Sequence, residues 1–547
     1  MSKVRIAHIA GPTATIQNTP PLVTSNKARE KHGLPARHNP DGSLPAFDAL
    51  RPQRLAAPAR IYVEQFSAHP LESDAAALYD APDGYIGEDG IFRRVRAKAG
   101  DRPVYEVELR PEDGLYPLPY MARQANGEPW EDECATPGAS AERARQTFFP
   151  DGSRLFEEID RLSVGGDGMA SPISSMADIS FYRATPSAGA APERRGRDYF
   201  SYRPLHLATQ APRPALATIT NEVQKIAASG AHDGLIWTQG SPQIEETSYW
   251  FNLLIDTTLP ICCNAAQRPQ GQMSHDGPKN IADSVRFLAS RVWADAEGRN
   301  KCGTVVIQEQ QIFAARDVAK GDARPGGYIA TGGAGGILGQ VGHLGAVALT
   351  YLPAYKHTYL SDVNINRLPE NSRAVRRHTA ATIETFEIAI KDARNNLLPE
   401  AIPVVSIVKD GAYSTLDYGD DPALEGDLKA SIDHKLGLDR LAGFVIEGLA
   451  PYGHSASTAR EKVLLQAVFS GLPVCRVGRG AQGFADPHPY QIAASNLTAT
   501  KARLLLMACL MKFGSLPPAE DPKNPTAHEL ARIRAELAAY QAIFLSH

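Results

Sequence analysis

Short apolar runs alternate with amphipathic stretches over most of the chain, and this pattern predicts strands that alternate with helices. The predicted strands occupy 4–10, 60–66, 104–109, 179–182, 235–237, 260–264, 304–308, 403–408, 443–447 and 473–477. The predicted helices occupy 155–162, 218–229, 245–255, 280–292, 380–392, 458–469, 500–513 and 527–544. Because strands joined through helices pair in parallel, we expect an α/β protein with parallel sheets in two unequal domains.

The segment 78–214 interrupts this alternation, since it is rich in Gly, Pro and charged residues and its strands are short. A loop of this length does not stay structureless inside a compact domain, so we expect an inserted subdomain, a lid or an oligomer arm. The chain then divides into an N-terminal domain over 1–375, a linker with a helix over 376–400, and a smaller C-terminal α/β domain over 401–547. The glycine-dense stretch 326–345 lacks the strand and helix that frame a dinucleotide site, and we expect a flexible connector there.

The composition is that of a globular protein and argues against several functions. The 547 residues are 43% hydrophobic and 22% charged, with a formal net charge of −4. We expect no nucleic-acid partner and no membrane partner, because the chain has no dense basic run and no apolar stretch of the roughly 18 residues that a membrane span needs. The first residues have no apolar signal core, and the six scattered cysteines are typical of buried thiols, so we predict a cytoplasmic protein.

The stretch 234–247 combines a buried strand, a glycine turn and the start of a helix. Gly240 permits a sharp turn, and we expect Glu245 in the first helical turn, where a carboxylate offsets the positive end of the helix dipole. A hydroxyl of Ser241 or Thr238 would then lie at the carboxyl end of a strand, where open α/β sheets bind ligands. Most such junctions do no chemistry, so this stretch alone predicts only an ordinary strand–turn–helix unit.

Four motifs follow one another between residues 238 and 320. They are Thr-Gln-Gly-Ser-Pro-Gln-Ile-Glu-Glu-Thr at 238–247, Arg-Pro at 268–269, Met-Ser-His-Asp-Gly-Pro-Lys-Asn at 273–280, and Arg-Asp-Val-Ala-Lys at 316–320. In order and spacing they resemble motifs of the asparaginase/glutaminase family of bacterial-type threonine amidohydrolases. The family versions are Thr-x-Gly-Thr-Asp-Thr-x-Glu-Glu-Thr, Met-Arg-Pro, Met-Ser-x-Asp-Gly-Pro-x-Asn and Arg-Asp-Val-x-Lys.

Looser matches lie on either side of these motifs. Thr-Ala-Thr-Ile at 13–16 stands where the family has Gly-Gly-Thr-Ile, and the segment 497–503 resembles Leu-x-Pro-x-Lys-Ala-Arg. The chain therefore looks like a divergent family member with a large insertion. The resemblance implies a larger N-terminal, flavodoxin- or Rossmann-like domain with a parallel sheet and a smaller C-terminal α/β domain. It also implies a homodimer or homotetramer without a cofactor.

Amide hydrolysis needs a nucleophile, a base for its proton and donors for the developing oxyanion. The resemblance assigns the nucleophile to Thr15, with Thr13 as the alternative because the usual flanking glycines are replaced. It places Ser241 at the second catalytic hydroxyl, which positions or activates water. Lys320 matches the lysine that pairs with this hydroxyl, and burial would favour its basic form. The chain has no cluster typical of a metal site: His275 beside Asp276 is more typical of a hydrogen-bonded core pair.

The departures from the family bear on the substrate. Pro242 stands where the family has the aspartate that binds the substrate's α-ammonium, and proline offers neither a carboxylate nor an N–H. We expect Ser73, at the position of the family's serine for the substrate carboxylate, and the adjacent Asp74 to bind substrate, together with Gly240 and Pro242. An α-ammonium buried without a partner would cost several kcal/mol, which makes free asparagine a poor substrate.

Three functions remain open on the sequence. The first is an amidohydrolase acting on a small amide without a free α-ammonium, such as a cyclic or N-substituted amide. The second is a true asparaginase or glutaminase in which Asp74 or Glu245 replaces the missing acid. The third is a non-catalytic ligand-binding or assembly protein on the same fold.

Overall fold

The computed structural model describes most of the chain. The described residues are 3–11, 42, 59–63, 81–87, 91–109, 173–183, 212–268, 276–324, 326–379, 382–411, 420–479 and 487–547. The predicted site residues Thr13, Thr15, Ser73 and Asp74 lie outside them, as does the helix predicted at 155–162. The domain boundaries that we predict stay predictions.

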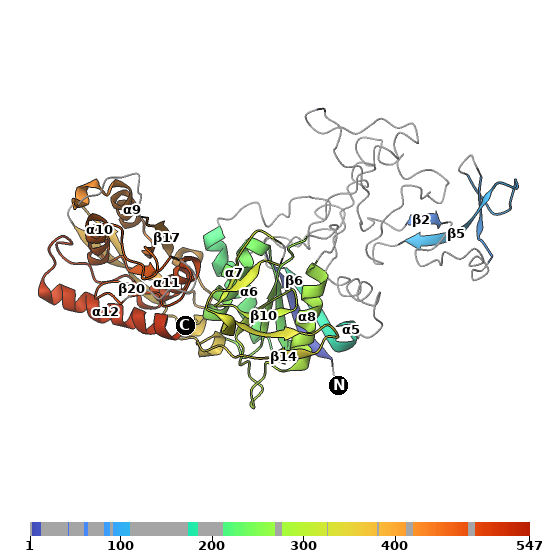
Figure 1. Ribbon diagram of the computed structural model, residues 1–547, viewed down its shortest axis with the longest axis horizontal. Coiled ribbons are helices and arrows are strands. Elements are labelled where there is room, and N and C mark those ends of the chain that lie inside the picture. Colours follow the sequence, from blue (N-terminus) through green and yellow to red (C-terminus); the bar gives the residue numbers. More distant parts are fainter. Residues whose placement is uncertain are drawn as a thin grey trace.

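An eight-stranded sheet forms the centre of the larger domain (Figure 1). Its order is β14 (Val347–Leu349), β13 (Ile337–Val341), β10 (Gln311–Ala314), β9 (Thr304–Gln308), β8 (Ile261–Asn264), β7 (Gly234–Thr238), β1 (Val4–Ala10) and β6 (Ala177–Arg183). The five strands from β9 to β6 pair in parallel, whereas β10, β13 and β14 continue the sheet in antiparallel pairs.

Helices cover both faces of this sheet, which explains why the strands β7, β8 and β9 are buried along their whole length. Leu235 and Trp237 of β7 belong to the same core as α6 (Pro212–Ala228) and α7 (Ser241–Leu254). Ile236 points the other way and joins the core formed with α8 (Gly277–Ser290) and the short α5 (Ile173–Met176). Successive side chains of a strand face opposite sides, so one apolar run supplies both cores.

A second, smaller α/β domain lies beside the first (Figure 1). Its parallel sheet has the order β17 (Val404–Lys409), β18 (Ala442–Glu447), β19 (Val474–Val477) and β20 (Ile492–Ala493). The helices are α9 (Gly426–Leu436), α10 (Thr458–Phe469), α11 (Ala499–Phe513) and α12 (Ala527–Ser546). Helix α11 packs on β17 and β18 and also on α7, so a single apolar core runs through both domains.

Smaller elements complete the described structure. A hairpin pairs β11 (Val318–Lys320) with β12 (Tyr328–Ala330), and another pairs β15 (Asn371–Arg377) with β16 (Ile383–Ala389). A separate antiparallel sheet has the order β2 (Ala59–Val63), β5 (Arg102–Leu109), β3 (Gly84–Ile86) and β4 (Phe92–Arg93). Single 3-10 turns occur at Ala334–Gly336, Thr358–Leu360, Ile365–Arg367, Pro399–Ala401 and Pro422–Leu424. In the described part of the chain, no helix has the length and apolarity to cross a membrane.

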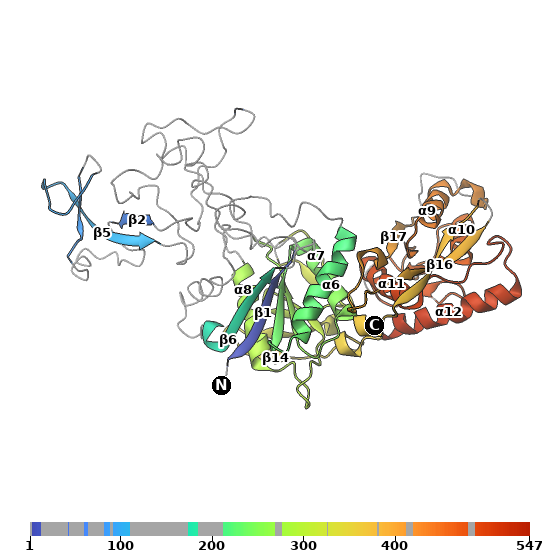
Figure 2. The same cartoon turned by 180° about the vertical axis from the view of Figure 1, so that it is seen from behind.

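The α/β fold class is confirmed, with parallel strands in both domains. The helix predicted at 380–392 is wrong: this segment forms β16, because its alternating β-branched and aromatic residues pair along the whole length of β15. The strand predicted at 179–182 falls within the predicted insertion, but as β6 it pairs with β1 in the main sheet (Figure 2). The stretch 326–345 contains β12 and β13, so it is not a structureless connector.

Candidate active site

Ser241 is the first residue of α7 and follows the carboxyl end of β7. Gly240 is the N-cap of α7. Pro242 suits the first helical turn, because a backbone N–H at that position would have no partner within the helix. The helix therefore starts four residues earlier than the sequence suggests. Glu245 consequently lies beyond the first turn, which contains no acidic residue. The positive end of the helix dipole at Ser241 is not offset by a carboxylate of its own helix.

The hydroxyl of Ser241 lies between two side chains from other elements. Gln267 Nε2 donates to Ser241 Oγ at 2.6 Å, and Tyr328 Oη lies 3.1 Å from the same oxygen. The Tyr328 hydroxyl donates its proton to the Ser241 carbonyl at 2.9 Å. The Ser241 proton is therefore available for the tyrosine oxygen, because a hydroxyl has one donor and two acceptor positions.

Lys320 ends β11 and reaches the same place from the neighbouring hairpin. Its ammonium donates to Gln267 Oε1 at 2.5 Å and to the Arg324 carbonyl at 2.7 Å. It also lies 5.3 Å from the centre of the Tyr328 ring. Within the described residues the ammonium hydrogen-bonds only neutral oxygens, so a positive charge is held beside Ser241 with the Gln267 amide between them.

The turn that carries Gln267 is fixed by a buried carboxylate at the start of α8. Asp276 Oδ1 accepts the backbone N–H groups of Gln267 and Arg268, each at 2.9 Å. Asp276 Oδ2 accepts Gln308 Nε2 at 2.6 Å and Asn280 Nδ2 at 3.2 Å. Hydrogen bonds to a carboxylate are stronger than those between neutral groups, so this turn is held rigidly.

Burial determines the protonation of the aromatic partner. It raises the pKa of Tyr328 to about 12, although the hydrogen bond with Ser241 acts in the opposite direction. Tyr328 is therefore protonated at neutral pH and serves as a hydrogen-bond donor rather than as a base. Burial also raises the pKa of Glu245, against the opposing effects of the Lys320 N–H and the nearby Lys501 charge.

The two adjacent glutamates of α7 attach the smaller domain to this site. The carboxylate of Glu245 accepts the backbone N–H of Lys320 at 2.5 Å, which fixes the end of β11. Lys501 of α11 is 1% exposed and donates to the carbonyls of Glu245 and Ala315, the latter at 2.7 Å. Burial lowers the pKa of Lys501 to about 8, and Glu245 opposes this shift. Glu246 of α7 pairs with Arg503, which lies on α11 with Lys501.

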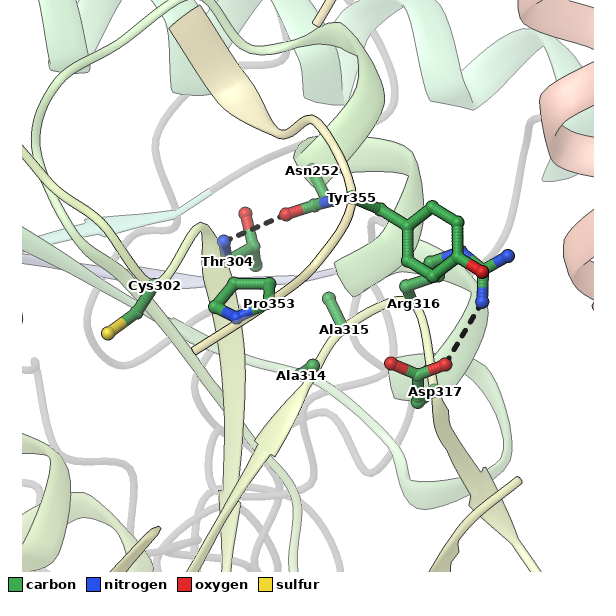
Figure 3. A pocket seen from close by; sticks show the side chains of 9 residues that line it. All are labelled: Asn252, Cys302, Thr304, Ala314, Ala315, Arg316, Asp317, Pro353 and Tyr355. Carbon is green, nitrogen blue, oxygen red and sulfur yellow. Dashed lines mark hydrogen bonds and ion pairs between the residues drawn. The ribbon is translucent and has the colours of Figure 1, made fainter. Parts of the chain in front are cut away.

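A small recess lies elsewhere in the larger domain and holds none of these groups (Figure 3). It encloses about 240 Å³ with its open mouth included, and its lining residues are Asn252, Cys302, Thr304, Ala314, Ala315, Arg316, Asp317, Pro353 and Tyr355. Arg316 stacks on Tyr355 and pairs with Asp317 at 3.1 Å, so its charge is already compensated. No group of three or more His, Cys, Asp or Glu side chains able to hold a metal ion occurs among the described residues.

A family model and two relatives of known name all relate this chain to asparaginases. The family model "Asparaginase, N-terminal" matches residues 206–331, which include β7, α7, β8, α8 and the β11–β12 hairpin. A glutaminase-asparaginase of Acinetobacter glutaminasificans is 25% identical over 305 residues, covering 54% of this chain and 76% of the relative. L-asparaginase 2 of Bacillus subtilis (strain 168) is 26% identical over 302 residues, covering 54% and 66%. These matches identify residues 206–331 as a region similar to the N-terminal part of asparaginases and support the assignment of the chain to the asparaginase family.

Solved structures are also similar to this chain. The crystal structure of a probable cytoplasmic L-asparaginase from Campylobacter jejuni has a TM-score of 0.47 and 22% sequence identity with this chain. The similarity covers 72% of this chain and 93% of that one.

The structure brings some of the predicted site residues together. Ser241, Gly240 and Lys320 meet at one site, and Pro242 lies in the first turn of α7. The predicted Ser–Lys pair is bridged by Gln267 instead of joined directly. Thr238, the alternative hydroxyl, is buried and bonds His8 Nε2 at 2.7 Å, which makes it part of the sheet core.

Sequence reasoning missed Gln267 and Tyr328. Gln267 precedes Arg268, at the position where the Met-Arg-Pro motif of the asparaginase family has methionine. This substitution was a signal, because it puts an amide where the family has a thioether. Tyr328 gives no such signal, since it follows Lys320 by eight residues in the glycine-dense stretch and reaches Ser241 only through the hairpin.

Proposed function

We propose that this asparaginase-family protein is an amidohydrolase whose substrate carries no free α-ammonium next to the scissile amide. The charge around Ser241 supports this proposal. The Lys320 ammonium and the N-terminus of α7 are both positive, and the first turn of α7 holds Pro242 and no acid. An ammonium placed here would meet like charges, whereas a carboxylate or a neutral carbonyl would be favoured.

The proposed nucleophile is Thr15, with Thr13 as the alternative. Sheet register supports a position near Ser241, because Ala10 at the end of β1 is level with Thr238 at the end of β7. The N–H of Gly11 continues this pairing and donates to the Thr238 carbonyl at 2.7 Å. Gly11 thus lies at the edge of the sheet where α7 begins. Both candidate threonines follow it within four residues in the sequence.

The chemistry follows from these roles. The threonine hydroxyl attacks the amide carbon, its proton passes to the amide nitrogen, and the carbon–nitrogen bond breaks, so that ammonia or an amine leaves and an acyl-enzyme ester remains. Water held by Ser241 then attacks the ester and releases the acid. Lys320 supplies positive charge on one side of Ser241 through the Gln267 amide, and Tyr328 Oη accepts the hydroxyl proton of Ser241 on the other.

Substrate profiling combined with nucleophile variants tests the proposal. Ammonia release is measured with asparagine and glutamine, and with succinamic acid and N-acetylasparagine, which lack the free ammonium. Ring opening of succinimide, which also lacks it, is followed by chromatography as the appearance of succinamic acid. We expect turnover of one or more compounds of the second group and little turnover of the first, and Thr15→Ala should abolish it. A mass increase on the peptide containing residue 15 after acid quench would locate the acyl group. Full activity in both Thr15→Ala and Thr13→Ala would overturn the nucleophile assignment.

The second candidate is an asparaginase in which another acid binds the ammonium. Glu245 is poorly suited to this role, because its carboxylate already accepts the Lys320 N–H and lies near Lys501. Asp74 lies outside the described residues. A preference for asparagine over succinamic acid in the same assay would favour this candidate. The third candidate, a non-catalytic protein, would release no ammonia from the amides of the panel and would not open succinimide.

A further inference from the structure

The Gln267 amide has an orientation that its neighbours dictate. The Lys320 ammonium has only donors, so the group facing it at 2.5 Å is the amide oxygen. The amide nitrogen then faces Ser241 Oγ at 2.6 Å and donates to it. One side chain therefore accepts from the lysine and donates to the serine at the same time.

This orientation determines the direction of the whole hydrogen-bond chain. Ser241 Oγ accepts a hydrogen bond from the Gln267 amide. Its own hydroxyl proton is therefore directed to Tyr328 Oη at 3.1 Å. Among the described residues no other group donates to Ser241 Oγ, so its second acceptor position is left for a water or a substrate N–H. The lysine charge polarises each donor along this chain and strengthens the bonds in sequence.

The backbone of Gln267 is also held in place. Its backbone N–H donates to the buried Asp276 carboxylate, and the neighbouring Arg268 N–H does the same. The side chain thus extends from a fixed turn toward two fixed partners, which is the kind of preorganised support that a catalytic group needs. Methionine, the residue of the family motif, is of similar length but can make neither of the two amide hydrogen bonds.

We propose that Gln267 is a positioning residue, which orients the Ser241 hydroxyl toward Tyr328 and holds the Lys320 ammonium at a fixed distance from it. This inference rests on the proposed amidohydrolase function for its catalytic consequence. It departs from a direct serine–lysine pair, because Lys320 acts on Ser241 only through the amide. The reaction then depends on an uncharged side chain that no catalytic motif includes.

The kinetic test compares Gln267→Met with a matched substitution elsewhere. Gln224 is the control, because its amide also makes two hydrogen bonds, both to the backbone of Asp256, and lies on α6. Gln267→Met should lower kcat by about 10- to 100-fold with a smaller change in KM, and should alter the pH profile of kcat. Gln224→Met should leave kcat and the pH profile unchanged even if it lowers the melting temperature. Wild-type kcat and pH profile in Gln267→Met would overturn the proposal.

A second measurement does not require turnover. The rate of Lys320 acetylation by dilute acetic anhydride is followed by mass spectrometry in the wild type and both variants. Loss of the amide acceptor should release the amine, so we expect faster acetylation in Gln267→Met, by about threefold or more, and no change in Gln224→Met. An unchanged rate in Gln267→Met would overturn the proposal. If the wild type releases no ammonia from any amide but the acetylation rates differ as expected, the proposed function fails while the positioning contact stands.

Discussion

The backbone N–H of Gln267 donates a hydrogen bond to Asp276 Oδ1 at 2.9 Å. Through this bond a carboxylate at the start of α8 fixes a residue whose side chain meets Ser241 on α7 and Lys320 on β11. Three elements that are distant in the sequence are thereby held in one geometry. The Asp-Gly-Pro-x-Asn motif, which contains Asp276, is therefore a support for the site and does not itself contact Ser241.

Asp276→Asn should weaken both the fold and the site. An asparagine has one acceptor oxygen where the carboxylate has two, and its NH₂ group would face donors such as Gln308 Nε2. We expect the free energy of unfolding to fall by about 2–4 kcal/mol, as for a buried charge network left partly unsatisfied. Urea denaturation measures this loss. A variant with wild-type stability would show that the carboxylate contacts are dispensable.

Two adjacent glutamates allow a comparison within one helical turn. Glu245→Ala leaves the Lys320 N–H without its acceptor and should cost about 1–3 kcal/mol. Glu246→Ala removes only a partly exposed pair with Arg503 and should cost about 0–1 kcal/mol. Thermal or urea unfolding of the two variants gives the ranking, and an equal or reversed order would refute the support role of Glu245.

His8 should make the protein sensitive to acid. Burial lowers its pKa from 6.5 to about 3, so the folded state keeps it neutral while the unfolded chain takes up a proton below pH 6.5. Its contribution to stability is complete above pH 6.5 and is lost as pH falls toward 3, at about 1.4 kcal/mol per pH unit in the limit.

The test of this acid sensitivity is the difference in unfolding free energy between the wild type and His8→Gln. The difference should shrink as pH falls from 6.5 to 4, since the variant has no histidine to titrate. His343→Gln, at an exposed histidine, is the control. A difference that stays constant over this range would contradict the prediction.

Pro242→Asp should restore an ammonium-binding acid. The position lies in the first turn of α7, where an aspartate is tolerated and is favoured by the helix dipole. We expect the ratio of asparagine to succinamic acid turnover to rise by about tenfold or more, through a charge-assisted bond to the α-ammonium. Pro242→Asn controls for the loss of proline. If both variants change the ratio equally, charge at this position does not select the substrate.

The local pattern of apolar and polar residues was sufficient to predict those helices and strands whose sequence fits only one conformation. The wholly buried strand β7 and the helix α10 lie where the pattern predicts them. It failed over 383–389, because this short amphipathic segment fits either a helix or a strand and pairing with β15 decides between them. It also placed β6 in an insertion, since strand order is a property of the sheet and not of the strand.

The sequence by itself determined the α/β class, the junction that presents Ser241 and the motif that supplies Lys320, because short-range sterics, apolar periodicity and residue identity are local properties. Only the tertiary structure decided that Gln267 lies between Ser241 and Lys320 and that Tyr328 is the last member of this series of hydrogen bonds. Those contacts join residues 53 and 87 positions apart. They depend on strand order, the hairpin after Lys320 and the carboxylate of Asp276, which act together only in the folded chain.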